Sequence, residues 1–185
     1  MTRLVHALLV LAACGESRSS TPAPGSTSTP PALETTPNSK RLCARLDLAA
    51  LAGALEIGEL TRTGRGSLST GGGAPPTLAC SYFEAGKVDG GLGFGFTLTA
   101  TAELEDRDPF NRFEWAPFDG LGRPAQIGRA EAKRSVHVQT VVNGVLLIAD
   151  VTHPGLAIPE LERRLVAVTQ HVIARLPADA SIEIR

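Results

Sequence analysis

The sequence lacks the features that identify most enzymes and nucleic-acid-binding proteins. Its 18 basic and 19 acidic residues nearly cancel, so the chain has no basic surplus for nucleic acid or for an acidic membrane surface. Aromatic residues make up only 4% of the chain, with one Trp and one Tyr. No catalytic, metal-binding or nucleotide-binding motif stands clear of chance. We therefore expect no nucleic-acid partner, no metal and no cofactor.

Long hydrophobic runs are also absent. The apolar run from Leu4 to Ala13 is too short for a membrane span, which needs about 20 residues. It follows Arg3 and ends in two alanines before Cys14, the order typical of a lipoprotein export signal. The sequence thus predicts a signal peptide over residues 1–13 and acylation of Cys14, for example with palmitate. The lipid then anchors the protein to the outer face of the cytoplasmic membrane. A secretory signal with a chance cysteine is the alternative.

Cysteine is scarce, with three in the chain. Lipidation of Cys14 uses one of them, which leaves Cys43 and Cys80 with a single connectivity. Outside the cytoplasmic membrane we expect a disulfide between them, with two free buried cysteines as the alternative. A catalytic thiol is disfavoured because no histidine is placed to suggest a partner.

The chain after the signal divides into a tether and a domain. Residues 14–40 are predicted to be disordered, because 17 of the 24 residues from Ser17 to Lys40 are Ser, Thr, Pro or Gly. Such a segment buries too little apolar surface to offset the entropy of ordering it. Residues 41–185 are long enough for one domain with its own core.

Two segments of this domain have the apolar spacing of an amphipathic helix. The first runs from Asp47 to Leu55, with Asp47 as a suitable N-cap and Gly58 as a suitable stop. The second runs from Pro159 to Leu176. Its apolar stripe consists of Leu161, Leu165, Val168, Val172 and Leu176.

Strand signals surround these helices. The segment from Leu92 to Ala100 alternates apolar and small or polar residues, as a half-buried strand does. Asn143-Gly144 is a two-residue hairpin turn between strands over 136–142 and 145–151. The glycine-rich stretch from Gly64 to Pro76 is predicted to be a loop. The sequence predicts an α+β fold with a mainly antiparallel sheet of four to six strands, covered on one face by the two helices.

Two regions are candidates for a ligand groove. Gly93 and Gly95 leave room on one face of their strand, and a bulge or close packing is the alternative. Half of the aromatic residues lie in one irregular segment, which suits either a core or a pocket for an apolar ligand. These aromatic residues are Phe110, Phe113, Trp115 and Phe118.

Several short motifs together resemble actinobacterial cell-envelope lipoproteins that are grouped under a domain of unknown function. The resemblance implies a small α+β domain with a Cys43–Cys80 disulfide, and it brings no established activity and no catalytic residues. Tyr82 stands where that family often has Trp. A looser resemblance is to the extracellular sensor domains of bacterial Ser/Thr kinases. The motifs are the export signal and tether, Cys43 with Leu46, Leu48 and Leu51-Ala52-Gly53, Cys80-Ser81-Tyr82, Gly120-Leu121-Gly122 with Ala125, the hairpin and the C-terminal helix.

The leading functional hypothesis is a non-catalytic, lipid-anchored binding or sensor module of the bacterial envelope. Its partner is either a small apolar ligand or another envelope protein. The alternative is an envelope hydrolase whose site is scattered along the sequence. The hairpin register places His137 opposite Asp150, and a hydrolase predicts a buried Ser or Tyr beside this pair in a cleft.

Overall fold

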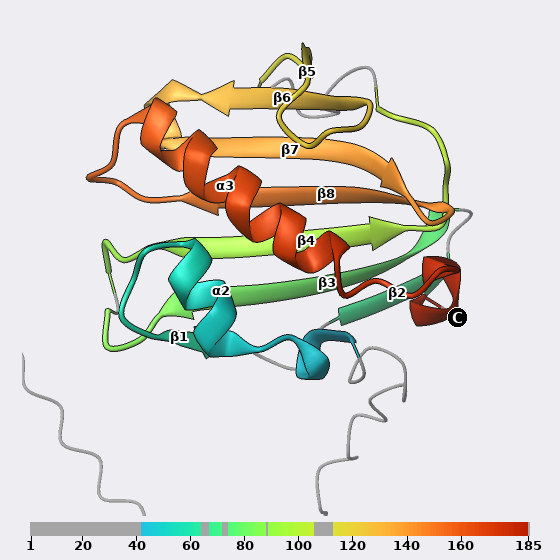
Figure 1. Cartoon of the computed structure of the whole chain (residues 1–185), viewed down its shortest axis with the longest axis horizontal. Coiled ribbons are helices and arrows are strands. Elements are labelled where there is room, and N and C mark those ends of the chain that lie inside the picture. The colour runs from blue at the N-terminus through green and yellow to red at the C-terminus, as the bar shows by residue number, and fades with distance from the viewer. Residues whose placement is uncertain (1–41, 64–66, 72–73, 88, 106–112, 185) are drawn as a thin grey trace, which may run out of the picture. The chain divides into compact units, whose positions relative to one another are not determined.

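The computed structural model describes residues 42–184 apart from 64–66, 72–73, 88 and 106–112. The predicted signal peptide, the tether, Cys14 and Phe110 lie outside the described residues. A helical turn over 42–45 precedes the labelled elements of Figure 1. These are α2 (Leu48–Ala54), β1 (Leu60–Arg62), β2 (Ser67–Gly71), β3 (Ala74–Glu84), β4 (Gly93–Thr99), β5 (Ala116–Phe118), β6 (Ala125–Ala130), η1 (Glu131–Lys133), β7 (Ser135–Val142), β8 (Val145–Thr152), α3 (Ile158–Ile173) and η2 (Ala180–Glu183).

The strands form one antiparallel sheet in the order β1-β3-β4-β8-β7-β6-β5, and β2 pairs with β3. The α+β class and the antiparallel sheet are confirmed, but eight strands exceed the predicted four to six. The additional strands include β1 and β5, which have three residues each and so are too short to show alternation. Another is β2, which lies in the glycine-rich stretch predicted to be a loop. Such short strands are held in place by pairing with longer neighbouring strands. Their own sequences carry no pattern that indicates this pairing.

The hairpin of β7 and β8 forms in the predicted register. Val142 pairs with Val145, and the pairing continues along both strands to Ser135 and Thr152. Asn143 and Gly144 have φ values of 49° and 81°, as a two-residue turn of the primed type requires. The prediction succeeded because the turn residues alone determine which side chains share a face.

The helix α2 has the predicted extent, from its N-cap Asp47 to its C-cap Leu55, but Gly58 is not the residue that stops it. Asp47 Oδ1 accepts hydrogen bonds from the backbone N–H groups of Ala49 and Ala50, at 2.9 and 3.3 Å. The helix does not extend toward Gly58, because the backbone N–H of Ile57 donates back to Ala52 O. This reversal closes the helix with a left-handed residue, Glu56, whose φ is 53°.

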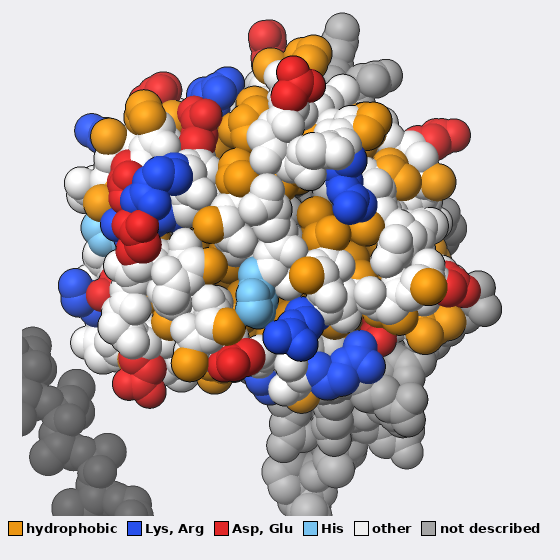
Figure 2. Space-filling model, in the orientation of Figure 1, with side chains coloured by type: hydrophobic (Ala, Val, Ile, Leu, Met, Phe, Trp, Pro, Cys, Tyr) orange, Lys and Arg blue, Asp and Glu red, His pale blue; other side chains and the backbone are white. Residues whose placement is uncertain are grey.

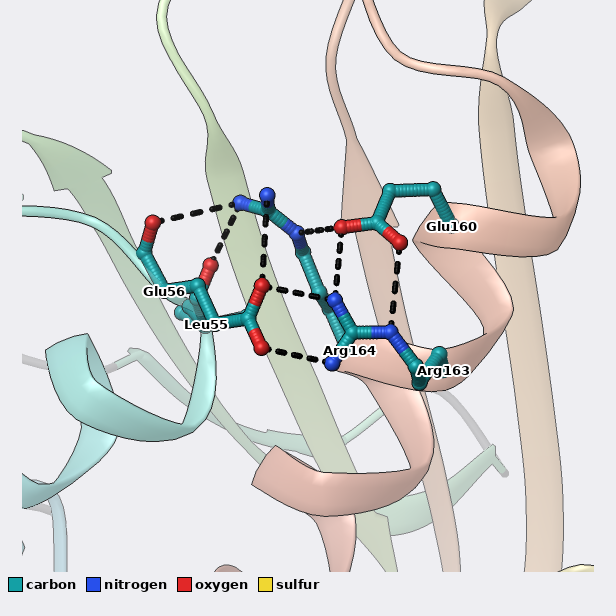
Figure 3. Close-up of polar contacts among 5 residues, drawn as sticks. All are labelled: Leu55, Glu56, Glu160, Arg163 and Arg164. Atoms are coloured by element: carbon teal, nitrogen blue, oxygen red, sulfur yellow. Dashed lines mark hydrogen bonds and ion pairs between the residues drawn. The ribbon is translucent and has the colours of Figure 1, made fainter.

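The side chain of Glu56 joins the end of α2 to the start of α3 (Figure 3). Its two carboxylate oxygens accept hydrogen bonds from Arg163 at 2.6 Å each. Arg164 donates to the carbonyl oxygen of Leu55 at 2.6 Å and to Glu160 at 2.8 Å. The hydrogen bonds from Arg163 lower the pKa of Glu56 and of Glu160 below the ordinary value. Both helices are therefore connected by a charge-neutral cluster at their adjoining ends.

The left-handed conformation of Glu56 gives a first testable prediction. The free energy of unfolding of Glu56→Gly is expected to be about 1 kcal/mol higher than that of Glu56→Ala. Only glycine adopts this φ without steric cost. Both variants lack the carboxylate, so their difference isolates the backbone effect from the loss of the Arg163 pair. Urea denaturation followed by circular dichroism measures it. The same pair of substitutions at Glu59, whose φ is not positive, should show no such advantage for glycine, and an advantage of the same size there would contradict the explanation.

Both helices pack on one face of the sheet (Figure 1). The helix α3 crosses β7, β8 and β4, while α2 lies over the β3 and β1 side. The stripe predicted for the second helix is buried, with Leu161, Leu165, Val168 and Val172 completely inaccessible to solvent. Beneath it lie Val136, Val138 and Val151 of the hairpin, also buried. Figure 2 shows this side of the molecule, on which acidic and basic side chains lie interspersed around the helices.

The predicted disulfide joins Cys43 to Cys80 of β3, with the two Cα atoms 5.8 Å apart. Both cysteines are buried, at 2% and 1% exposure. The Tyr82 hydroxyl donates a hydrogen bond to the Cys43 carbonyl at 3.3 Å. The Tyr82 ring stacks with Phe94, whose ring centre is 5.7 Å away. The disulfide and Tyr82 thus attach the first helical turn to the sheet.

Candidate functional site

The sheet has a second face opposite α2 and α3, here called the back face. Successive side chains of a strand point to opposite faces of the sheet. The residues that alternate with the buried core positions therefore lie on the back face. Phe83 is 48% exposed there. The back-face residues are mostly small or polar: Ser81, Phe83, Gly93, Gly95, Thr97, Gln126, Gly128, Ser135, His137, Gln139, Ile148, Asp150 and Thr152.

The space above Gly93 and Gly95 is taken by neighbouring side chains. A Cβ atom on Gly93 would lie 3.4 Å from the Phe83 ring, and one on Gly95 would lie 2.9 Å from Asp150 Oδ1. The carboxylate of Asp150 therefore leans toward β4. The contact at Gly95 matches the close-packing alternative, because a Cβ atom there would be too near the Asp150 carboxylate. At Gly93 the Phe83 ring lies at an ordinary van der Waals distance from the Cβ position.

The aromatic segment divides between two places. The Phe113 ring lies over Gly128 of β6, where a Cβ atom would approach it to 2.3 Å. The same ring stacks on the imidazole of His137, with centres 4.4 Å apart, and meets Trp115 edge-on at 4.7 Å. Phe118 instead covers Gly120 and packs partly against the core. Phe113 and Phe118 therefore pack over different glycines, Gly128 and Gly120.

Phe118 lines an apolar pocket of about 500 Å³ at the β5 edge of the sheet, here called the β5 pocket. Small-molecule sites in proteins have volumes of roughly 300 to 1,000 Å³ and mostly apolar walls with a few polar groups. Asp119 and Gln126 are the polar lining residues of this pocket. Its apolar walls are formed by Leu104, Pro117, Phe118, Pro124 and Ala125.

A buried glutamine fixes one wall of the β5 pocket. Gln139 is completely buried on β7, and its side-chain oxygen accepts a hydrogen bond from the backbone N–H of Glu105 at 3.0 Å. Its amide nitrogen donates to the Glu105 carbonyl and to Gln126, the latter at 2.6 Å. The peptide groups on both sides of Glu105 are held, so the neighbouring Leu104 is kept at the pocket wall. The sequence reveals Gln139 only as a polar strand residue, and nothing in it indicates this role.

A second pocket of about 200 Å³, here called the Ser135 pocket, lies at the start of β7. Ser135 Oγ lies 2.6 Å from Nε2 of His137. His137 and Asp150 are paired across the hairpin as predicted. The sequence did not single out Ser135 as a candidate. Its position two residues before His137 on a strand does place both side chains on one face. The pocket is lined by Phe113, Ala130, Lys133, Ser135, His137 and Thr152.

The contact between Phe113 and Gly128 gives a second prediction. Gly128→Ala is expected to push the Phe113 ring off β6, because the added Cβ atom has no room beneath it. Loss of the stacking on His137 should lower the free energy of unfolding by about 1 to 2 kcal/mol. The fluorescence of Trp115, the sole tryptophan, should also shift as its aromatic neighbour moves. Gly58→Ala, where a Cβ atom meets nothing within 4 Å, is the control and should leave the emission unchanged.

The described part of the chain contains no cluster of three or more His, Cys, Asp or Glu residues that could hold a metal ion. Among the same residues, no helix is long and apolar enough to cross a membrane.

No family model, curated protein or solved structure matches the chain. The resemblance to actinobacterial lipoproteins therefore stays a prediction from the sequence motifs.

Proposed function

We propose that the chain is a lipid-anchored binding module of the bacterial envelope that takes a small apolar ligand in the β5 pocket. The observation that carries this proposal is the pocket itself, about 500 Å³ in volume with five apolar lining residues. The lipid on Cys14 would hold the module at the outer face of the cytoplasmic membrane. The Cys43–Cys80 disulfide supports this location, because such bonds persist in oxidising compartments.

The position of the pocket in the sheet suits an anchored module. The chain enters the domain at Cys43, which is bonded to β3. Five strand spacings separate β3 from β5, or about 24 Å at about 4.8 Å per spacing. Figure 1 shows β5 at one edge of the sheet and β3 toward the other. The β5 pocket therefore lies away from the disulfide between Cys43 and β3. A ligand can reach it while the tether holds the domain at the membrane.

Mass spectrometry of the protein purified from native membranes tests the location and the ligand class together. We expect an acylated Cys14 at the mature amino terminus, an intact disulfide and a co-purifying lipid or other apolar molecule. A mature protein that retains residues 1–13, or that lacks acyl chains, would refute the anchoring. Co-purification of a stoichiometric envelope protein, with no small molecule, would favour a protein partner instead.

Binding to the purified protein tests the pocket directly. Palmitate serves as the apolar probe, added below its aggregation concentration and followed by calorimetry. Leu104→Glu places a charge in the pocket wall and should weaken binding at least tenfold, because burying an unpaired carboxylate is unfavourable. Phe83→Ala removes an exposed aromatic ring elsewhere on the sheet and should leave the affinity unchanged. Absence of binding, or equal effects of both substitutions, would count against the β5 pocket.

A further inference from the structure

We propose that Ser135 and His137 form a nucleophile and general-base pair that hydrolyses esters of short acyl groups. This activity goes beyond the binding function and does not depend on the β5 pocket. Ser135 Oγ and His137 Nε2 are 2.6 Å apart, within the range expected of an activated serine. Both side chains line the same cavity, the Ser135 pocket, so a substrate there meets the hydroxyl directly.

The surroundings hold both groups in place. Phe113 stacks on the imidazole at an interplanar angle of 22°, which restricts rotation of the ring while leaving Nε2 directed at Ser135. Gly128 makes this possible because a side chain there would displace Phe113. Ser135 itself is only 4% exposed, so its side chain is held by its neighbours while it lines the wall of the Ser135 pocket. Phe113 is accordingly a positioning residue for the pair.

The backbone before Ser135 is also constrained. Arg134 has a φ of 49°, in the left-handed region that side chains other than glycine rarely adopt. Its N–H donates to Glu131 O, and its carbonyl accepts from the His153 N–H, both at 3.1 Å. These two bonds maintain the turn that carries the chain from η1 into β7. Arg134 thus ends η1 in the way that Glu56 ends α2, and it sets the direction in which β7 begins at Ser135.

The reaction needs only these groups and water. In the tautomer with a proton on Nδ1, the Ser135 hydroxyl donates to Nε2 of His137. Oγ attacks the ester carbonyl carbon, and its proton passes to Nε2. The bond to the leaving alcohol then breaks, and the alcohol oxygen takes that proton. Water attacks the acyl-serine and gives a proton to Nε2, which returns it to Oγ as the carboxylic acid leaves.

The lining of the pocket indicates the class of substrate. Lys133 supplies a positive charge that can stabilise the negative oxygen of the tetrahedral intermediate. Thr152 supplies a hydroxyl for hydrogen bonding, and Phe113 and Ala130 supply apolar contacts for the acyl group. A volume of about 200 Å³ suits a short acyl group such as acetyl. Esters of small carboxylic acids are therefore the expected substrates.

Labelling with a fluorophosphonate probe tests the proposal on the purified full chain. The probe should modify Ser135, as mapped by peptide mass spectrometry, and the protein should hydrolyse p-nitrophenyl acetate faster than buffer. Ser135→Ala should abolish both signals. His137→Gln should slow labelling and hydrolysis by about 100-fold or more, the range that a general base contributes.

Ser81→Ala is the matched control, because Ser81 is exposed on the same back face two strands from β8. It should be labelled and should hydrolyse the ester like the unaltered protein. Circular dichroism and Trp115 fluorescence establish that each variant is folded. The proposal is overturned if the unaltered protein is not labelled, or if the label maps to Ser81 or another serine. Failure of palmitate binding leaves these outcomes unaffected, so the two proposals stand or fall separately.

Discussion

Replacing Cys43 and Cys80 together by alanine is expected to lower the free energy of unfolding by about 4 kcal/mol. The bond joins residues 37 apart in sequence, and it restricts the unfolded chain by closing a loop of that size. Loop-closure entropy for such a loop corresponds to about 4 kcal/mol at 25 °C. Most domains of this length are stable by only about 5 to 15 kcal/mol, so the loss is a large part of the total.

Urea denaturation of the double variant and of the unaltered protein, each with and without dithiothreitol, measures this effect. The reductant should destabilise the unaltered protein by about the same amount and leave the double variant unchanged. The native circular dichroism spectrum should persist in both, because most of the buried apolar contacts between α2, α3 and the sheet are made by residues other than the two cysteines. A change below 1 kcal/mol would contradict the expectation and would mean that the unfolded chain is already compact.

The parts of the fold that the sequence predicts correctly are those determined by near neighbours. Asn143-Gly144 sets the hairpin register because a two-residue turn allows only one alignment of its strands. Asp47 begins α2 because its side chain satisfies N–H groups two and three residues later. The predicted end of α2 at Leu55 is correct, but the stop residue was not Gly58, because the left-handed residue after the helix is Glu56. A glutamate carries no sequence signal for that conformation.

The parts that escape prediction depend on contacts between distant segments. The strand β5 exists because Pro117 and its neighbours pair with β6, and three residues carry no pattern of their own. Glu183 is buried, with a side-chain exposure of 5%. It pairs with Arg45, which lies near the other end of the domain's sequence. Charged residues at those positions give no indication of such a contact. Only the folded arrangement places them together.

In the candidate sites, too, local sequence patterns predict some contacts, and contacts between distant segments escape prediction. The strand pattern places His137 opposite Asp150, and the structure has this pairing. It does not indicate that Ser135 lies within hydrogen-bonding distance of the imidazole, because side-chain rotamers decide that contact. The aromatic segment is recognisable by composition alone. Its division between Phe113 on the back face and Phe118 in the β5 pocket depends on which glycines lie beneath the rings.

Tyr82, the single tyrosine of the chain, is expected to make the protein unstable in alkali. Burial raises the pKa of its hydroxyl from 10 to about 12, and the nearby charge of Arg62 offsets part of that rise. The folded state therefore holds the proton more tightly than the unfolded state does. The resulting stability is fully present below pH 10 and is lost as the pH rises through 12. Two pKa units correspond to about 2.7 kcal/mol.

Comparison with Tyr82→Phe isolates this contribution from other groups that titrate in alkali. At neutral pH the variant should be about 1 kcal/mol less stable, since it lacks the hydrogen bond to the Cys43 carbonyl. Between pH 10 and 12 the order should reverse, because phenylalanine has no proton to lose and remains favourably buried beside Phe94. Unfolding in urea at each pH gives the two curves, and they should cross in that interval.

Absorbance at 295 nm reports the phenolate of Tyr82 alone, because no other tyrosine is present. In the native protein its titration should have a midpoint near 12, and in concentrated urea the midpoint should return to about 10. A native midpoint near 10 without loss of structure would mean that solvent reaches the hydroxyl. That result would contradict the packing of Tyr82 between the first helical turn and the sheet. The same titration can be repeated after reduction of the Cys43–Cys80 disulfide. If the midpoint stays near 12, the aromatic core buries the hydroxyl, since Tyr82 stacks on Phe94 and Phe96 independently of the sulfur bond.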